Sequence, residues 1–512
     1  MTFSCSMTAP SDAPPTLTSV CEGAARLAVA QELNSQPGSA AGFFNPRMRL
    51  NRELCLAEVR AALRPGAWRA RPRDSQAAGS SGEGLGAEGH AVRLLDAFAA
   101  SGSLAVRIAL EVAPESARPL QVTAADIDPR CCELAALNGE LLNGLRVRRL
   151  RAVLQGDEDG GEAEAADTAL ALAIRALASG AEMAEPARKR QARADAGGVC
   201  GDGRESGGEG GGEGGGEGGG ESGGESGGEG GGEGGGEGGG GGESGGGGAE
   251  LTVACADARA LLLMQPPYEY AHLDPFGSCA PHLDAFAARA PHGGLLSLTA
   301  TDTAALYAHY PQVARRTYAA TLDRKDPNWR EAGVRALCGA LAAAAARHGR
   351  GVQVLHAAAA AHFVHVVARI ERGAAAADRA MALVTTVTTP DGAALGPLWA
   401  GPLNEPQFVR RAAEAAAAAE AREGASREDV AAAREARLLF ERSLDDAPAM
   451  PPFSYATGHT SPPAVVAALR ARGFAAARSA YDGDASKPGS SRRVRTDAPA
   501  EVYAEVLQAA RQ

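Results

Sequence analysis

The sequence predicts an α/β fold, in which helices flank a doubly wound and mostly parallel sheet. Two observations indicate this fold. Over 91–126, a strand, a turn of small residues, a helix and a second strand ending in an acid follow one another, and the strand-then-acid pattern returns at 251–257 and 271–274. Ligands of such sheets bind beyond the carboxyl ends of the strands, so acids placed there favour a nucleotide-like ligand.

The first part of the chain leads into this sheet. Residues 1–42 have the composition of an irregular lead-in, and a helix is expected over 50–63 with Asn51 as its cap. Residues 64–90 are rich in Pro and Arg and then in Gly and Ser, which predicts a surface insertion. We therefore expect the sheet to begin at residue 91.

The expected elements of the sheet follow in order, with a long insertion at 145–250. A turn at 99–103 separates the first strand from a helix over 104–112, and a second helix is expected over 129–142. Short apolar runs bounded by turn residues predict the strands. These strands are 91–98, 121–125, 251–255, 271–273, 294–299, 352–356 and 363–370.

The insertion contains a low-complexity tract. Residues 201–250 hold 32 of the 66 glycines, 12 acidic residues and one arginine. Such a composition buries too little apolar surface to fold, so we expect disorder there. The tract's net charge of −11 equals that of the entire chain, so the remainder is neutral overall. A basic, nucleic-acid-binding face is therefore compatible with the acidic total.

Composition also excludes several classes of protein. Nine cysteines without a CxxC pair predict neither a zinc ribbon nor a disulfide framework, and they indicate a reducing compartment. No apolar run approaches the ~20 residues of a membrane span, and the first fifteen residues lack the basic residues of a targeting peptide. No histidine pair has the spacing of a metal site, so we expect no metal. We expect an intracellular protein of the nucleus or cytoplasm, with an organelle as the alternative; the oligomeric state is not indicated.

Beyond residue 371 the character of the sequence changes. A Thr/Pro-rich stretch leads to the segment GPLWAGPL at 396–403, and an Ala/Glu/Arg-rich helix is expected over 405–443. A helical segment with a pair of basic strands is expected over 451–512. These features predict a smaller α+β domain over 371–512.

The turn at 96–103 and two later strand ends form a candidate ligand site. The turn begins with Asp96, and Gly102 lets a ligand approach the backbone in front of the following helix; an ordinary βα turn is the alternative. Asp126 lies where an acid typically binds ribose hydroxyls, with a helix N-cap as the alternative. The pair Asp257-Ala258 repeats the pattern and suits the edge of an adenine ring.

The run HLDPFGS suits methylation of an amino group on a flat base. Its acid, Asp274, can accept a hydrogen bond from an NH2 group, as can the carbonyl of Pro275, and Phe276 can stack on the base. Together these contacts draw the nitrogen lone pair out of conjugation with the ring. A bare turn capped by the aspartate is the alternative, because a four-residue motif alone is weak.

The segment FFNPRMRLNREL at 43–54 precedes the sheet with aromatic and basic residues. Phe43 can stack on a base, and Arg52 can pair with a carboxylate. The alternative is structural, since the same residues suit a hydrophobic staple and cap at a helix start.

These motifs, in this order, resemble the tRNA (guanine-26, N2) dimethyltransferase family, whose members use S-adenosylmethionine (SAM). The resemblance extends from about residue 19 to 505. It implies a Rossmann-like class I SAM-dependent methyltransferase domain over 43–370 and a tRNA-binding domain over 371–512. The segments that carry it are FFNPRMRLNREL, LLDAFAASGSLAVR, AADIDPRCCELAALN, ADARALL, HLDPFGS, LTATDTAAL and GPLWAGPL.

The resemblance also implies roles for the candidate residues. The residues matched to SAM contacts are Arg52, Asp96, Gly102, Arg107, Asp126, Asp257 and Ala258. Asp274 matches the catalytic acid with Pro275 beside it, and Phe43 and Phe276 match aromatic residues that hold the flipped guanine. Arginines at 492, 493 and 495 match the segment that holds tRNA. The expected reaction is methylation of the guanine N2 amine, first to the monomethyl and then to the dimethyl product.

The chain departs from the family pattern at several positions. Leu104 replaces the first arginine of the small-residue motif, and His272 replaces an acid. The family's DHYxR run reads Ala361-His362-Phe363-Val364-His365, without the acid and the arginine. Two alternatives therefore stay open: a methyltransferase for another RNA or DNA amino group, and an inactive RNA-binding relative.

Overall fold

The computed structural model describes residues 17–30, 44–64, 91–151, 250–360, 362–445, 450–482 and 492–510. Its larger compact unit, Met1–Ala181 with Gly247–Gln512, contains all of these residues. The second unit, Glu182–Gly246, lies outside them, as do residues 201–249 of the Gly/Glu tract and nearly all of the predicted insertion at 64–90.

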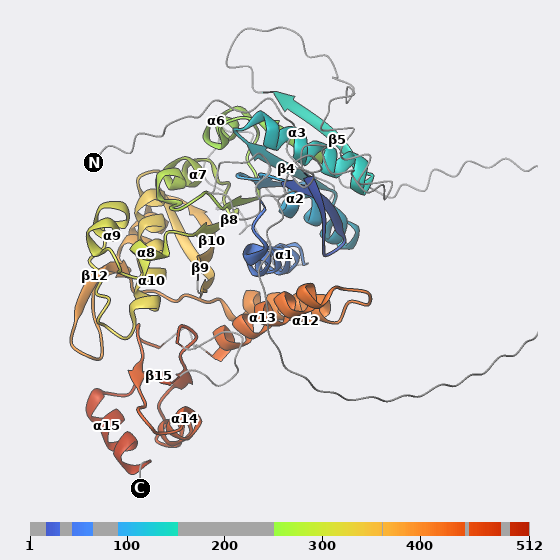
Figure 1. The fold of residues 1–512 in the computed structure, drawn as a ribbon. Coiled ribbons are helices and arrows are strands. Elements are labelled where there is room, and N and C mark those ends of the chain that lie inside the picture. Colours follow the sequence, from blue (N-terminus) through green and yellow to red (C-terminus); the bar gives the residue numbers. More distant parts are fainter. Residues whose placement is uncertain are drawn as a thin grey trace, which may run out of the picture. The chain divides into compact units, whose positions relative to one another are not determined.

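An eight-stranded sheet forms the centre of the described chain (Figure 1), in the order β5-β6-β4-β3-β7-β8-β10-β9. The strands from β5 to β8 in this order are parallel, and β10 runs antiparallel to both β8 and β9. The α/β fold and the predicted strands are confirmed. The bounds are β3 Val92–Asp96, β4 Leu120–Asp126, β5 Arg146–Arg151, β6 Glu250–Cys255, β7 Tyr270–Leu273, β8 Leu295–Ala300, β9 Arg350–Ala359 and β10 Val364–Arg372.

Both faces of the sheet are buried. Successive residues of a strand point to opposite faces, and Leu94 and Leu95 of β3 accordingly belong to two different apolar clusters. Every residue of β7 and β8 is buried, as expected for parallel strands covered on both sides. Four polar side chains are nevertheless buried on β7, β8 and β10, namely His272, Ser297, Thr299 and His365.

Helices between the strands cover the sheet. The helix α2 packs on β3 and β4, α3 packs on β4 and β6, and α10 packs on β9 and β10. No helix of the described residues is long and apolar enough to cross a membrane. The bounds are α1 Arg49–Leu63, α2 Ser103–Arg107, α3 Pro129–Leu137, α6 Ala258–Met264, α7 Leu283–Arg289, α8 Thr303–Leu306, α9 Pro311–Tyr318, α10 Trp329–Ala346 and α11 Ala374–Met381; α2 and α3 continue as π-helical turns over Ile108–Val112 and Asn138–Leu142.

Three expectations for the sheet and its lead-in are corrected. Part of the irregular lead-in is a hairpin of β1 (Leu17–Glu22) and β2 (Ala25–Ala30), closed by a two-residue turn in which Gly23 adopts a φ of 62°. The strand β5 lies at the start of the expected insertion; its four arginines suit a sheet edge, where charge prevents further pairing. Asn51 is not a cap, because α1 begins at Arg49 and Asn51 lies inside the helix. The asparagine that caps is Asn45, which accepts from the Arg47 amide at the preceding turn.

The C-terminal part confirms the predicted α+β character. The expected single helix over 405–443 is two helices, α12 (Pro406–Glu420) and α13 (Arg427–Asp445), separated near Gly424 with a φ of 74°. They pack on each other and on α1 (Figure 1). The remaining elements are the hairpin β11 Val384–Thr388 and β12 Ala394–Trp399, a sheet of β13 Tyr455–Ala456, β15 Arg493–Thr496 and β14 Ala476–Arg478, and helices α14 Pro462–Ala471 and α15 Ala500–Ala509.

Candidate active site

Three carboxylates gather at the carboxyl edge of the sheet. Asp96 ends β3, Asp126 ends β4 and Asp274 follows β7, and these three strands are parallel neighbours. Burial, together with the nearby carboxylates of Asp274 and Asp126, raises the pKa of Asp96 to about 7. The edge therefore favours a ligand that brings positive charge or hydrogen-bond donors.

The turn after β3 fixes the carboxylate of Asp126. The amide of Ala100 donates to Asp126 Oδ2 (2.9 Å), and the amide of Asp128 donates to Oδ1 (3.0 Å). Asp128, not Asp126, caps α3 through the amide of Arg130, so the N-cap alternative for Asp126 is wrong. Each anchored oxygen keeps acceptor capacity for a ligand hydroxyl.

Gly102 is the most constrained position of this turn. Its φ is 76°, and a Cβ there would lie 2.8 Å from the Cβ of Ala135. We expect Gly102→Ala to lower the free energy of unfolding by about 1–3 kcal/mol, because strain and overlap add. Gly293→Ala is the matched control, since its φ is 81° but a Cβ would meet nothing within 4 Å. Equal losses in urea unfolding would contradict the overlap with Ala135.

Asp257 is held by its own helix. It caps α6 by accepting the Arg259 amide, and its carboxylate also pairs with the Arg259 guanidinium (2.6 Å). This hydrogen bonding outweighs partial burial and lowers the pKa of Asp257 to about 2. Ala258 is the first residue of α6 and is buried. The end of β6 adjoins Asp126, whose carbonyl accepts from the Ala256 amide (2.9 Å), but the adenine contact of this pair stays a prediction.

The DPFG loop presents an acid beside an exposed aromatic ring. Burial, opposed by Arg52, raises the pKa of Asp274 to about 7, and Phe276 is 60% exposed. The loop is tied to the end of β8, because the amide of Gly277 donates to Thr301 Oγ1 (2.9 Å). Pro275 is buried between the acid and the ring. Phe43, the second predicted aromatic residue, lies outside the described residues.

The two predicted SAM arginines belong to a buried ion cluster. Arg52 donates to both carboxylate oxygens of Glu22, and Arg107 pairs with Glu22, Glu53 and Glu111 at 2.7–3.0 Å. The charge of Arg52 reaches the strand-end acids, since it lowers the pKa of both Asp96 and Asp274. Arg107 is only 1% exposed. The structure therefore brings Arg52 to the site and engages Arg107 within the protein.

Sequence reasoning missed the residues behind Asp274. Asn51 Nδ2 donates to Asp274 Oδ2 (3.0 Å), and the Thr299 hydroxyl donates to Asn51 Oδ1 (2.9 Å). Beyond Thr299 lie His365 and Glu58, both fully buried. The sequence offered one signal for these residues. Asn51 lies on the apolar face of α1, and Thr299 and His365 lie in the apolar strands β8 and β10. A polar residue in such a place needs a hydrogen-bonding partner inside the protein.

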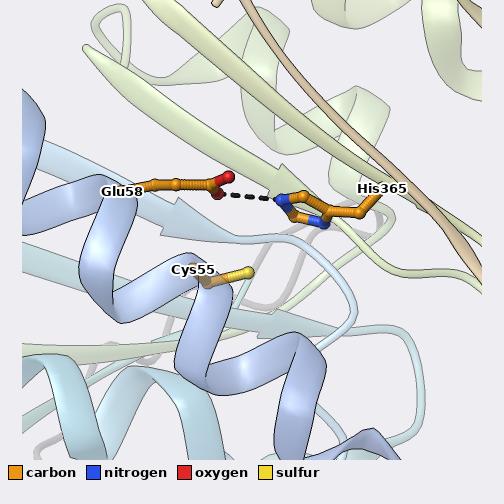
Figure 2. A group of neighbouring side chains, drawn as sticks. All are labelled: Cys55, Glu58 and His365. Carbon is orange, nitrogen blue, oxygen red and sulfur yellow. Dashed lines mark hydrogen bonds and ion pairs between the residues drawn. The ribbon is translucent and has the colours of Figure 1, made fainter. Parts of the chain in front are cut away.

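Cys55, Glu58 and His365 lie together beneath the site (Figure 2), with their potential ligand atoms within 4.8 Å of one another. Both oxygens of Glu58 already accept hydrogen bonds, one from His365 and one from His356. The pKa of the Cys55 thiol is raised, mainly by burial and also by the charge of Glu58. The thiol therefore stays protonated and binds metal poorly. We interpret the three as hydrogen-bonding neighbours, and a metal-free site stays a prediction.

Comparison with known proteins shows which family the chain resembles in sequence. The family model described as "N2,N2-dimethylguanosine tRNA methyltransferase" matches residues 23–155 and 248–392. A tRNA (guanine(26)-N(2))-dimethyltransferase of Pyrobaculum arsenaticum is 34% identical over 178 residues, covering 33% of this chain and 50% of the relative. A tRNA (guanine(27)-N(2))-dimethyltransferase of Rattus norvegicus is 38% identical over 129 residues, covering 25% and 18%. The chain thus spans half or less of these relatives.

A solved structure has the same fold. It is described as Trm1 from Pyrococcus horikoshii in complex with S-adenosyl-L-methionine, and it superposes with a TM-score of 0.58 over 96% of this chain and 99% of that chain. The sequence identity is 21%, so this likeness concerns the fold.

Proposed function

Because the chain belongs to the N2,N2-dimethylguanosine tRNA methyltransferase family, we propose that it methylates the exocyclic N2 amine of guanine 26 in tRNA, using SAM. One observation carries this proposal: a carboxylate with a pKa of about 7, Asp274, lies beside the exposed ring of Phe276 at the carboxyl edge of the sheet. A base of this pKa is suited to accepting a proton near neutral pH.

The residues at the strand ends fit SAM. Asp126 offers anchored oxygens that would bind ribose hydroxyls, and Asp96 adds a second carboxylate at the same edge, which would suit the positive charge of the cofactor. The absent Cβ of Gly102 would face Ala135 of α3, so in this proposal Gly102 shapes the turn by packing on that helix. When bound, SAM supplies a methyl group on a positively charged sulfur, which this acidic edge favours.

The methyl transfer needs an amine lone pair and an acceptor for one proton. The nitrogen lone pair forms the new N–C bond as the C–S bond breaks and its electrons go to sulfur. The nitrogen then loses a proton to Asp274. The carbonyl of Pro275 accepts from the remaining N–H, and Phe276, with Phe43 as the predicted second ring, stacks on the guanine. The base must first leave its stack, at a cost of a few kcal/mol.

Binding of tRNA is proposed for residues 371–512, with one change to the expected contacts. Arg493 donates to Ser454, and Arg495 pairs with Glu331 at 2.6 Å; both arginines are buried. Because these two arginines already have buried partners, the proposed phosphate contacts are assigned to exposed basic residues such as Arg492. We expect steeply salt-dependent binding through exposed basic residues.

The decisive experiment measures transfer of labelled methyl from SAM to unmodified tRNA transcripts. We expect label on the wild-type transcript, none when guanine 26 is replaced by adenine, and both mono- and dimethylguanine among the digested nucleosides. Guanine 27 is the second candidate, because some relatives modify that position. Loss of label only with the guanine 27 replacement would move the target there. Absence of label with every transcript, other RNA and DNA would overturn the proposal.

A further inference from the structure

The helix α9 carries two exposed arginines at the carboxyl edge of the sheet. Arg315 and Arg316 lie in its last turn on the solvent side, whereas Ala314 and Tyr318 are buried. The helix follows β8 and α8, and α8 and α9 pack on each other (Figure 1). The charge of α9 is therefore presented at the same edge as the exposed ring of Phe276.

A buried tyrosine connects α9 to the DPFG loop. The Tyr318 hydroxyl lies 2.7 Å from the Ser278 hydroxyl, and it donates to the Asp302 carboxylate at 2.7 and 2.9 Å. Ser278 follows Phe276 by two residues, and Tyr318 follows Arg316 by two residues. This contact therefore fixes the arginines of α9 relative to the ring of Phe276.

The loop after α9 adds two further cations. Arg324 and Lys325 are exposed, and the guanidinium of Arg324 lies over the ring of Trp329, 3.8 Å from the ring centre. This stacking holds the guanidinium in place and leaves the N–H groups in its plane available to an acceptor. The one acid of the segment 311–325 is Asp323, whose carboxylate accepts from the Lys325 amide (2.8 Å).

These four cations lack the acidic partners that exposed arginines have elsewhere. We call them the basic α9 surface: Arg315, Arg316, Arg324 and Lys325. Within the part of the chain that the structure describes, none of the four forms an ion pair with a carboxylate. Several exposed arginines on other elements do form one, namely Arg130, Arg259, Arg347, Arg379 and Arg472. The basic α9 surface therefore keeps its charge for a partner.

The chemistry of this surface fits the backbone of RNA. Guanidinium groups bind phosphate oxygens through paired N–H donors, and cations gathered on one face are typical of a nucleic-acid site. Tyr310 lies immediately before α9 and is 56% exposed, and an aromatic ring among cations is suited to stacking on a base. An acidic peptide would use the cations but not the ring, so RNA is the favoured partner.

We propose that the basic α9 surface binds the tRNA phosphates next to the extruded guanine and so positions that nucleotide against Phe276. This inference rests on the proposed function and extends it, because it places part of the tRNA contact in the catalytic domain as well as in residues 371–512. Phosphate contacts fix the register of a nucleic acid without reading its sequence. Contacts beside the target also offset part of the few kcal/mol that extrusion of the base costs.

Two double variants test the surface, because each removes two positive charges. Arg315→Ala/Arg316→Ala changes α9. The control is Arg347→Ala/Arg379→Ala; Arg347 precedes β9 and Arg379 pairs with Glu371 of β10. Because β10 runs antiparallel to β8 and β9, its end and the start of β9 lie at the opposite edge of the sheet.

The measurement is binding of unmodified tRNA, by fluorescence anisotropy, between about 0.05 and 0.2 M KCl. The α9 variant is expected to bind about 5- to 50-fold more weakly, and the slope of log K against log salt should become shallower by about 1–2. The control variant should stay within about twofold of the wild type, with the same slope. Arg315→Lys/Arg316→Lys keeps the charge and should keep the wild-type slope.

Neutral backbone linkages test where the surface acts. A tRNA with methylphosphonates at the two linkages that flank the target guanine lacks charge only there. The wild type should bind this tRNA more weakly than ordinary tRNA, whereas the α9 variant should lose little more, because the two partners of one contact give non-additive losses. Melting temperature and affinity for SAM should match the wild type, as for other surface substitutions.

Three outcomes separate the alternatives. Equal tRNA affinity and salt slope in the α9 variant and the wild type would overturn the proposal and favour an acidic protein segment as the partner. Additive losses on the methylphosphonate tRNA would overturn the placement of the surface beside the guanine. A shallower slope with non-additive losses, but without methyl transfer to any nucleic acid, would instead reject the proposed function alone.

Discussion

Replacement of Asp274 by asparagine is expected to lower kcat for methyl transfer by about 10²- to 10⁴-fold, the range typical of losing a general base. Asparagine keeps the size of the side chain but cannot accept the proton that the amine loses. Affinity for SAM should change little, because the proposed ribose and turn contacts come from other strands. Single-turnover transfer of labelled methyl and SAM titration measure the two quantities separately.

The same variant should not be less stable. Folding raises the pKa of Asp274 from 3.8 to about 7, so an ionised Asp274 costs free energy in the folded state. The resulting loss of stability develops as pH rises from about 4 through 7. The asparagine of the variant does not ionise, and we expect its melting temperature at pH 8 to equal or exceed that of the wild type.

Asp378→Asn is the control, since Asp378 is exposed on α11, which packs against the edge strand β9. It should retain both activity and stability. An Asp274 variant with the kcat of the wild type would show that Asp274 is not the base of the reaction. A lowered melting temperature at pH 8 would contradict the prediction that ionisation of Asp274 destabilises the folded protein.

Replacement of Arg107 by methionine is expected to lower the free energy of unfolding by about 3–5 kcal/mol, as when one partner of a buried ion cluster is removed. Arg107 is 1% exposed, and its partners Glu22, Glu53 and Glu111 have side chains no more than 4% exposed. Without the guanidinium, three buried carboxylates would face one another with less positive charge. Urea unfolding measures the loss.

Arg347→Met is the matched control for this change. Its pair with Asp284 is exposed on both sides, 59% and 51%, so the loss should not exceed about 1 kcal/mol. If Arg107→Met unfolds like the control and instead weakens SAM binding, the cluster contributes little and the cofactor role implied by the resemblance is favoured.

Local sequence patterns were sufficient for most of the fold. A parallel strand that is buried on both faces must be apolar throughout, so it can be predicted from a short stretch of sequence. This was the case for β3, β4, β6 and β7 and for the acids that follow them. The same patterns failed for β5, whose arginines resemble a charged loop, and for the hairpin at 17–30, whose pairing follows from a turn near Gly23.

The candidate site divides in the same way. The sequence by itself identified the acids at the strand ends and the DPFG loop, since a side chain at the carboxyl end of a parallel strand has its place set by the strand. It did not identify the partners. Asn51 and Asp274 are 223 positions apart, and Glu58 and His365 are 307 apart, distances at which no local pattern specifies contact.

The sequence therefore determined which chemical groups the sheet presents, and the tertiary structure decided their charge states and their neighbours. Arg107, Arg493 and Arg495 were basic residues available to ligands in the sequence, but packing gave each of them buried partners. Asp274 was an ordinary acid in the sequence, but burial raised its pKa and placed a hydrogen-bonded chain behind it. The physical reason is that desolvation and pairing of charge arise only when distant segments pack together.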